Sequence, residues 1–412
     1  MARIAVVRQG YFVICPRVRS EAESLLEAGH EVDVFCLRLP GEPKDQVQGR
    51  LRIRRFSIPH RRSGLASYVF EYLAFLLVAA LQVGWRHLRR PYDLVQVNTI
   101  PDSLVFSALL PRLLGARVLI DLHESMPEFL STKFKIGLRH PLVRLAAAVE
   151  QAAIGFADFA TTCTEPMRRV FIARGAPAEK IGVVMNSTGL GLQATAIQRL
   201  APHPGRFVLI CHGTIEERYG LDTIVRALAL LKDEIPDLDL AIYGNGSDVP
   251  RIRSMVAELE LTDRVSFSNG WVPMPELIQA IVEADAGVVA MKRDAFRDLT
   301  LCTKMFDYIG LHKPAIVSRT RSVEEYFDAS CFRLFTAGDE HDLARAITEV
   351  YRDGALRRRL VERASQVARP YHWSRQRERY LEIVTALVTG RRHEPITQPR
   401  DEEAEMPRLA QQ

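Results

Sequence analysis

Short apolar runs alternate with longer amphipathic stretches along the first half of the chain. The runs are typical of buried strands, and apolar residues at helical spacing between them predict helices. A polar loop is expected to begin at Gly10, and Gly29 ends the first helix. The predicted strands of this half are 4–7, 31–36, 51–56, 94–97, 117–122, 159–162 and 181–185. Its predicted helices are 18–28, 67–88, one that ends at residue 114, 142–157 and 165–174.

The same alternation starts again at Phe207. The predicted strands are 207–211, 238–243, 265–267, 286–289 and 315–317, with helices at 221–232, 249–259 and 276–284 and a last one from Ser365 to about Val388. Strands that alternate with helices predict an α/β fold of two Rossmann-like, doubly wound domains. Open sheets of this kind bind ligands at the carboxyl ends of their strands, so the two domains are expected to face each other across a cleft.

Two stretches of the chain lack this alternation. Residues 188–205 are rich in Gly, Thr, Gln, Pro and His, which is typical of a linker. Residues 390–412 are charged and almost free of large apolar side chains, which predicts a disordered tail. The predicted units are therefore an N-terminal domain, 1–195, a C-terminal domain, 203–370, and a helix, 371–389, that crosses back to the N-terminal domain.

The composition is that of a soluble globular protein, since the 412 residues are 47% hydrophobic and 25% charged. The net charge is only +5, but basic residues gather in the first half of the chain. They are Arg50, Arg52, Arg54, Arg55, Arg61, Arg62, Arg86, Arg89, Arg90, Lys133, Lys135, Arg139 and Arg144. This distribution favours an anionic surface or substrate. The six cysteines form no CxxC pair, which argues against zinc and disulfides and fits a reducing cytoplasm.

The most apolar stretch, Leu65–Gly84, is about long enough to span a bilayer, but Glu71 and Gln82 interrupt it. We therefore expect a buried or membrane-lying helix rather than a spanning one. Basic clusters flank the stretch, which predicts peripheral binding to an anionic membrane surface, and the competing interpretation is a helix of the domain core. The first residues lack the pattern of a signal peptide, so a cytoplasmic protein is expected, peripheral on the inner membrane face.

The stretch from Asp294 to Ser318 predicts an anion site. A helix entered near Thr303 would direct its free N–H groups and its dipole at a ligand, and Lys304 adds a charge in the first turn. Asp307 lies one turn further on and can face the same pocket. A diphosphate suits the first two groups and a hydroxyl pair suits the carboxylate, as in a sugar nucleotide. An ordinary surface helix with a solvated lysine and aspartate explains the stretch about equally well.

Several motifs resemble those of one known family. They are EAGHEVDVF, YDLVQVNTIPD, DLHESMPE, KIGVVMNS, HGTIEERYGLDTIVRALALL, DLAIYGNG, LTDRVSFSNGWV, TKMFDYIGLHKPAIVS and YHWS. In this order and spacing the chain resembles the GT-B fold, family-4 retaining glycosyltransferases, except in its tail. The resemblance implies transfer of a sugar from a nucleotide-diphosphate sugar, with retention at the anomeric carbon. The implied acceptor is a polysaccharide or a lipid-linked saccharide, bound by the N-terminal domain, while the C-terminal domain binds the donor.

The chain departs from the family in its acidic pair. The family usually carries two glutamates eight positions apart, and here Asp307 stands at the second place. The first place falls on Leu299, with Asp298 adjacent. The resemblance therefore implies that Asp307 contacts the donor, and it makes Asp298 the candidate for a displaced first acid.

A second departure concerns the cations that hold the diphosphate. The family uses an arginine and a lysine where this chain has Thr214 and Tyr219. Arg218 lies beside the second position, so we assign the diphosphate to Arg218 together with Lys304. No metal and no other cofactor are expected if these cations supply the positive charge, and no nucleic acid is expected as a partner.

By the same resemblance His123 faces the donor sugar from the N-terminal domain, although a loop histidine can also cap backbone groups. The expected catalytic residues are His123, Arg218, Lys304 and Asp298. The expected donor-nucleotide contacts are Gly10, Gly213, Thr214, Gly244, Asn245, Gly246, Trp271, Val272, Thr303 and Asp307. The expected residues on the acceptor side are Asn98 and Glu124.

Two other functions compete with this interpretation. The departures at Thr214 and Leu299 are also consistent with a catalytically silent GT-B subunit that binds a partner glycosyltransferase. A nicotinamide-dependent oxidoreductase is poorly supported, because Gly10 is not part of a GxGxxG run after the first strand. Hydrolysis or transfer of a nucleotide sugar would separate the enzyme from the silent subunit.

Overall fold

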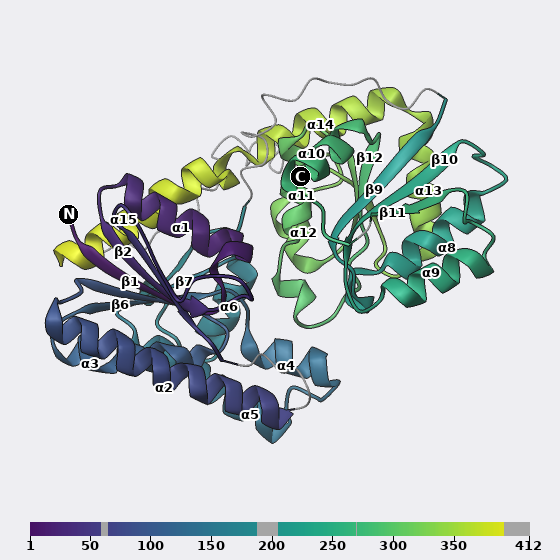
Figure 1. The fold of residues 1–412 in the computed structure, drawn as a ribbon. Helices are drawn as coiled ribbons and strands as arrows, with labels where there is room; N and C mark the ends of the chain where they lie inside the picture. The colour runs from purple at the N-terminus through teal and green to yellow at the C-terminus, as the bar shows by residue number, and fades with distance from the viewer. Residues whose placement is uncertain (59–64, 188–204, 269, 391–412) are drawn as a thin grey trace, which may run out of the picture. The chain divides into compact units, whose positions relative to one another are not determined.

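A computed structural model describes residues 1–58, 65–187, 205–268 and 270–390 of the chain (Figure 1). The chain divides into two compact units, here called unit 1 and unit 2. Unit 1 comprises Met1–Asn186 and the chain from Ser374 onwards, and unit 2 comprises Ser187–Trp373. The predicted linker falls almost wholly on 188–204 and the predicted tail on 391–412, both outside the described residues.

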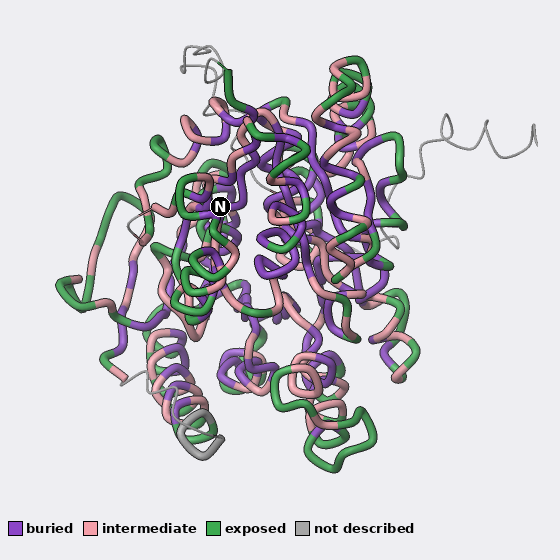
Figure 2. Tube along the Cα trace, turned by 90° about the vertical axis from the view of Figure 1, so that its right-hand side faces the viewer, coloured by how far each residue is buried: buried purple, intermediate pink, exposed green. Residues whose placement is uncertain are grey.

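Unit 1 contains an eight-stranded sheet in the order β3-β4-β2-β1-β5-β6-β7-β8. Its strands are β1 (Arg3–Tyr11), β2 (Glu31–Leu37), β3 (Asp45–Gln48), β4 (Leu51–Phe56), β5 (Leu94–Asn98), β6 (Arg117–Leu122), β7 (Phe159–Thr162) and β8 (Ile181–Val183). All neighbours pair in parallel except β3, which pairs antiparallel with β4. The apolar runs therefore form the expected parallel sheet, whose inner strands are largely buried (Figure 2), whereas the edge strand β3 is mostly exposed.

Two predictions about the strands of unit 1 are wrong. The polar edge strand β3 carries no apolar run, so its pairing with β4 across a short turn could not be seen in the pattern. The expected loop at Gly10 is absent, because β1 continues to Tyr11, where it pairs with Leu37 of β2 after an irregularity. Gly10 thus lies within the strand rather than at the start of a loop.

Helices cover both faces of the unit 1 sheet. They are α1 (Pro16–Glu27), α2 (Leu65–Arg89), α3 (Leu109–Leu113), α4 (Met126–Phe134), α5 (Pro141–Phe156), α6 (Glu165–Ala173) and α15 (Trp373–Thr389), with a 3-10 helix, η2 (Asp102–Ala108), before α3. In Figure 1, α1 and α15 lie on one face, and α2, α3 and α5 on the other. The last helix is held to the sheet by Tyr380, whose hydroxyl donates to Gln96 Oε1 at 2.5 Å.

Unit 2 contains a six-stranded parallel sheet in the order β11-β10-β9-β12-β13-β14. Its strands are β9 (Phe207–Thr214), β10 (Leu238–Asn245), β11 (Val265–Phe267), β12 (Ala286–Val289), β13 (Ala315–Ser318) and β14 (Arg333–Phe335). Its helices are α8 (Leu221–Leu231), α9 (Val249–Glu258), α10 (Met274–Glu283), α11 (Thr303–Gly310), α12 (Arg321–Tyr326), α13 (Glu340–Arg352) and α14 (Gly354–Val367). Together with unit 1 this confirms the predicted fold of two Rossmann-like domains.

The predicted continuous helix from Ser365 to Val388 is wrong. The structure has the end of α14 at Val367, a 3-10 turn over Arg369–Tyr371, and then α15 from Trp373. Pro370 lies in that turn, and a proline removes a helical hydrogen bond and collides with the carbonyl of the preceding turn. The break coincides with the passage of the chain from unit 2 back to unit 1.

Candidate functional site

The candidate site of unit 2 begins at the first turn of α11. The helix starts at Thr303, where the sequence predicts it, after Cys302, whose side chain makes no capping hydrogen bond. The N–H groups of the first turn therefore keep their capacity to bind an anion. Lys304 and Asp307, both predicted site residues, are largely buried on this helix at 8% and 6% exposure.

Lys304 lies across the end of β9. A Cβ atom at Gly213, where φ is +96°, would come within 2.7 Å of Lys304 Cε. Only glycine leaves room for the lysine stem here and also tolerates the left-handed backbone. The Lys304 Nζ lies 4.4 Å from the centre of the Tyr219 ring, so an ammonium and an aromatic face are held together in a confined space.

Two more cations surround the same tyrosine. The Arg218 guanidinium carbon lies 5.2 Å from the Tyr219 ring centre, and that of Arg297 lies 5.6 Å from it. Arg218 also pairs with Glu216 at 2.5 Å. Three positive charges thus gather about one ring, here called the Tyr219 cluster: Lys304, Arg218 and Arg297. Such a cluster has the charge and donors for a diphosphate.

The Tyr219 cluster brings together the two predicted cations and one that was missed. Arg297 was missed because it lies in a loop without periodicity, and no local signal shows that it is only 7% exposed. Tyr219, noted only as a departure from the family, is the residue about which the cations gather. Its neighbour Gly220, at φ +66°, could not carry a Cβ because Ala290 O lies 1.9 Å from that position.

The glycines of the turn after β10 are required by the protein's own backbone. A Cβ at Gly244 would lie 1.9 Å from Gly213 O, and one at Gly246 would lie 1.9 Å from Ile215 O. Contact with the donor nucleotide, for which these glycines are expected residues, is therefore not needed to explain why they are glycines. Asn245 pairs in register with Thr214 at the ends of the two strands, next to Gly213 and Lys304.

A bridge from Gly244 to Gly270 leads to the predicted contacts Trp271 and Val272. Gly244 N also donates to Ser268 Oγ at 2.9 Å, which holds this part of the chain on the glycine turn. The Trp271 side chain is 65% exposed and Val272 is half-buried. An exposed indole beside a glycine turn can stack on a base.

Asp307 has a histidine neighbour that the sequence reasoning missed. His212 Nε2 lies 3.6 Å from Asp307 Oδ2, and the imidazole packs edge-on against Tyr308. Burial and, to a smaller extent, the charge of Lys304 lower the pKa of His212 to about 3. The imidazole is therefore neutral near pH 7 and does not neutralise the carboxylate of Asp307.

Asp298 has structural partners. Each carboxylate oxygen lies 2.9 Å from Arg293 Nε, and Oδ1 accepts from the backbone N–H of Arg321 at 3.2 Å. Its carbonyl oxygen accepts from Ser322 Oγ at 2.7 Å. These contacts hold the 3-10 turn of Asp298 to the start of α12, while Leu299, at the first acidic place of the family, is a buried core residue.

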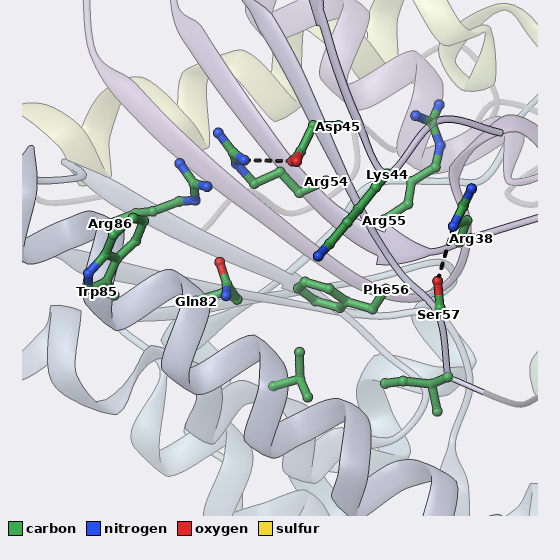
Figure 3. A pocket seen from close by; sticks show the side chains of 12 residues that line it. Arg38, Lys44, Asp45, Arg54, Arg55, Phe56, Ser57, Gln82, Trp85 and Arg86 are labelled. Atoms are coloured by element: carbon green, nitrogen blue, oxygen red, sulfur yellow. Dashed lines mark hydrogen bonds and ion pairs between the residues drawn. The ribbon is translucent and has the colours of Figure 1, made fainter.

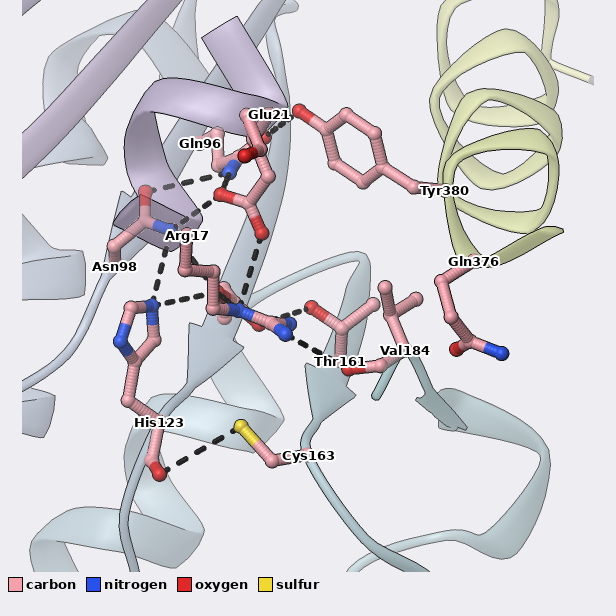
Figure 4. Close-up of polar contacts among 12 residues, drawn as sticks. Arg17, Glu21, Gln96, Asn98, His123, Thr161, Cys163, Val184, Gln376 and Tyr380 are labelled. Carbon is pink, nitrogen blue, oxygen red and sulfur yellow. Dashed lines mark hydrogen bonds and ion pairs between the residues drawn. The ribbon is translucent and has the colours of Figure 1, made fainter. Parts of the chain in front are cut away.

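The candidate site of unit 1 is centred on His123, which follows β6. Its backbone N–H donates to Thr99 Oγ1 at 3.3 Å. The ring Nε2 lies 2.7 Å from Asp121 Oδ2 and 3.3 Å from Asn98 Nδ2 (Figure 4). An ionised carboxylate can only accept a hydrogen bond, so Nε2 is protonated and donates a hydrogen bond to Asp121. The other ring nitrogen, Nδ1, is therefore an acceptor.

Asp121 anchors a buried polar network beneath the histidine. Arg17 donates to both its oxygens at 2.7 and 2.6 Å, and Thr161 Oγ1 donates to Oδ1 at 2.8 Å. Burial by itself raises the pKa of Asp121, but the charge of Arg17 and the hydrogen bonds from Arg17 and His123 outweigh it and hold the pKa well below its ordinary value. The carboxylate is thus ionised, and its charge is balanced by Arg17.

The other ionisable groups of this network are neutral. Burial and the charge of Asp121 raise the pKa of Glu21 to about 8, with Arg17 acting in the opposite direction. The pKa of His123 is lowered to about 4, because burial lowers it by more than the charge of Asp121 raises it. Near pH 7 the network therefore holds one ion pair, a protonated Glu21 and a neutral imidazole.

Three further predicted residues belong to unit 1. Asn98, expected on the acceptor side, is fully buried and donates to Glu21 Oε2 and Asp121 Oδ2 at 2.8 and 3.0 Å, so it positions the groups beneath His123. Gly10 lies in β1, with Arg8 Nε 3.4 Å from where a Cβ would stand. Glu124 is half-buried beside His123. In the described part of the chain no three His, Cys, Asp or Glu side chains gather to hold a metal, and metal independence stays a prediction.

Two protein-family models match the chain. A glycosyl transferase 4-like domain matches residues 14–187, and glycosyl transferases group 1 matches residues 193–367. The chain is 29% identical over 281 residues to 2-deoxystreptamine glucosyltransferase from Streptomyces kanamyceticus, which covers 64% of this chain and 71% of that protein.

Solved structures show the same fold. Sucrose-phosphate synthase from Thermosynechococcus elongatus superposes with a TM-score of 0.75 at 21% identity, covering 95% of this chain and all of that one. Anabaena HepE in complex with UDP-glucose superposes with a TM-score of 0.69 at 15% identity, covering 94% of this chain and all of that one. At such identities the likeness concerns the fold.

Proposed function

The chain belongs to the glycosyltransferases of the family-4 type with the GT-B fold, and from this we propose a retaining enzyme that uses a nucleotide-diphosphate sugar. The proposed acceptor is a polysaccharide or a lipid-linked saccharide at the cytoplasmic membrane face. The UDP-glucose bound by the structural neighbour HepE supports a nucleotide sugar as the donor.

The Tyr219 cluster is the observation that carries this proposal. When the glycosidic bond breaks, negative charge develops on the departing diphosphate. Lys304, Arg218 and Arg297 gather beside the first turn of α11, whose N–H groups have no side-chain cap. Donors fixed before the reaction stabilise the charge of the transition state more than that of the bound donor. This charge set does not call for a metal at the diphosphate.

Two further residues have proposed roles. Asp307, on the second turn of α11, accepts hydrogen bonds from the ribose hydroxyls, and the His212 imidazole beside it is neutral. His123 accepts a hydrogen bond from a sugar hydroxyl through Nδ1, because Asp121 holds Nε2–H. Neither role involves proton transfer by His123, whose lowered pKa suits a neutral acceptor.

The Tyr219 cluster also bears on the silent-subunit alternative. That alternative rests on Thr214 and Tyr219, where the family has an arginine and a lysine. In the structure, Tyr219 is the ring about which Lys304, Arg218 and Arg297 gather, so cations from other positions replace the missing ones. This arrangement favours the active enzyme.

A screen of nucleotide sugars by thermal unfolding tests the proposal. A donor present at about 100 times its Kd adds roughly 2.7 kcal/mol to the free energy of unfolding, which raises the unfolding temperature measurably. The stabilising donor is then incubated with saccharide and lipid-linked acceptors, and the anomeric configuration of the product is read by NMR. The proposal is wrong if no nucleotide sugar stabilises or is consumed by the folded protein, and an inverted product would refute retention alone.

A further inference from the structure

Unit 1 contains a second site, away from the strand ends that carry His123. It is a cavity of about 680 Å³ between the edge of the sheet and α2 (Figure 3). Its lining is Arg38, Lys44, Asp45, Arg54, Arg55, Phe56, Ser57, Ile58, Val78, Gln82, Trp85 and Arg86. We refer to it as the edge pocket. Arg54 and Arg55 come from β4, and Gln82, Trp85 and Arg86 come from α2.

The edge pocket carries an excess of positive charge. Its lining includes five cationic side chains and one carboxylate, Asp45, which pairs with Arg54 at 2.6 Å. A second carboxylate, Glu42, lies 3.2 Å from Arg55 Nε. Two acids thus face five cations, so the pocket is suited to an anion with more than one negative charge.

Two of these guanidinium groups keep a donor that no described residue uses. The Nε atoms of Arg54 and Arg86 are buried and have no hydrogen-bond partner among the described residues. Burial and the charge of Arg54 lower the pKa of Arg86, which shows that the two cations repel each other. Phosphate oxygens between them would accept these hydrogen bonds and remove the repulsion.

The pocket adjoins an exposed apolar helix face. The inward side of α2 is fixed on the sheet by Phe75, Ala79 and Val83, which are fully buried. The outward side carries exposed apolar side chains at helical spacing: Val69, Phe70, Leu73, Leu77, Leu81, Trp85 and Leu88. By length and composition α2 could span a bilayer, but its buried side belongs to the core of unit 1. A helix held in this way cannot cross a bilayer, and only its outward side is placed to contact a membrane surface.

The apolar face extends beyond α2. Neighbouring helix α3 packs against it through Leu110, which lies 3.0 Å from where a Cβ at Gly84 would stand, and exposes Leu109 and Leu113. Trp85 stacks with Arg89, whose guanidinium carbon lies 3.7 Å from the ring centre. Tryptophan and arginine at the rim of an apolar surface are typical of a membrane interface.

We propose that the edge pocket binds the phosphate headgroup of an anionic membrane lipid while the outward face of α2 lies among the acyl chains. Trp85 and Gln82 belong to both the pocket and the helix, so one lipid can occupy the pocket with its chains along α2. This inference deepens the proposed membrane-face acceptor and rests on that part of the proposed function. It requires nothing of the donor site in unit 2.

Flotation of the full chain with vesicles tests the pocket. Phosphatidylcholine vesicles with and without phosphatidylglycerol are compared for the parent protein and for R54Q/R86Q. Each arginine near an anionic surface contributes to the free energy of membrane binding. The loss of both is expected to lower the partition coefficient about 30-fold. The control R19Q/R345Q removes the same charge from exposed positions outside the pocket and is expected to bind as the parent does.

A second pair of variants tests the apolar face. L77S/L81S is expected to weaken binding to the same vesicles by more than tenfold, since each leucine loses its burial in the acyl region. The control Leu230→Ser changes an exposed leucine of α8 in unit 2 and is expected to have no effect. Thermal unfolding of each variant shows that it is folded.

Three results would overturn the proposal: equal binding to neutral vesicles, parent-like vesicle binding by R54Q/R86Q, or an effect of R19Q/R345Q as large as that of R54Q/R86Q. Inorganic phosphate distinguishes the two sources of the anion. If it stabilises the parent but not R54Q/R86Q, and both still bind vesicles equally, the pocket is a site for a soluble phosphate and the lipid is excluded. Donor hydrolysis without vesicles, which R54Q/R86Q should retain, tests the proposed enzyme separately.

Discussion

Replacing Lys304 by methionine removes a charge and keeps an unbranched stem. The stem lies across Gly213 and the ammonium faces the Tyr219 ring, so methionine can fill the same space. In the described part of the chain Lys304 forms no ion pair, and Arg218 and Arg297 share its ring. The substitution therefore relieves repulsion between cations, and we expect the free energy of unfolding to be unchanged or slightly higher.

The effect on catalysis should be large. Removing one preorganised donor from a developing oxyanion costs roughly 3 to 4 kcal/mol, which lowers kcat about 100- to 1000-fold. The ground-state diphosphate keeps Arg218, Arg297 and the N–H groups of α11. Losing one charge-assisted hydrogen bond of about 1.5 kcal/mol then weakens donor binding only about tenfold. The ratio of the two losses identifies Lys304 as a transition-state residue.

The assay has three readouts on the same preparation. Donor consumption gives kcat, titration calorimetry gives the donor Kd, and thermal unfolding gives stability. Lys232→Met is the control, because Lys232 is a partly exposed lysine of unit 2 that pairs with Glu260. Parent-like turnover in folded Lys304→Met, or equal losses in kcat and affinity, would refute the assigned role. A drop in stability without a change in kcat would make Lys304 a structural residue.

Four further substitutions test the remaining site residues. Asp307→Asn should weaken donor binding by roughly 1.5 to 3 kcal/mol by calorimetry. Asp298→Asn removes the charge that pairs with Arg293, so it should lower the unfolding temperature and leave donor affinity unchanged. Gly213→Ala should cost roughly 1 to 2 kcal/mol of stability at its positive φ and also lower kcat, because its methyl group displaces Lys304. The pKa of His123 in the folded protein is about 4, below its ordinary value of 6.5, so the stability of the parent should decline as the pH falls from 6.5 to 4 by up to about 3 kcal/mol from this group. In His123→Gln that decline should be smaller by about this amount, and an identical pH profile in chemical denaturation would contradict the lowered pKa.

Local features of the sequence identified much of the fold because they depend on neighbours along the chain. Runs such as Ile4–Val7 became strands, and Thr303 became the first residue of α11. The polar strand β3 has no local signal, because it depends on pairing with β4 rather than on periodicity. The break at Pro370 has a local signal in the proline itself, but the apolar periodicity on both sides of it predicts a continuous helix.

The residues of the candidate site were likewise predictable in part from the sequence and in part only from the tertiary structure. The sequence by itself indicated Lys304, from its place in the first turn of a helix, and the family resemblance added Arg218 and His123. Only the tertiary structure showed what surrounds them. The Tyr219 ring gathers cations from three separate segments, and Arg17 reaches Asp121 across 104 positions of sequence to hold the acid beneath His123.

The long apolar helix shows the limit of sequence reasoning most clearly. Its composition predicts burial in a core or contact with a membrane, and the pattern of residues alone allows both. The structure buries Phe75 and Val83 and leaves Leu77 and Leu81 exposed, so one side belongs to the core and the other does not. Sequence determines which residues are apolar, but the packing of the sheet decides which of them lose contact with solvent, because burial is a property of the whole fold.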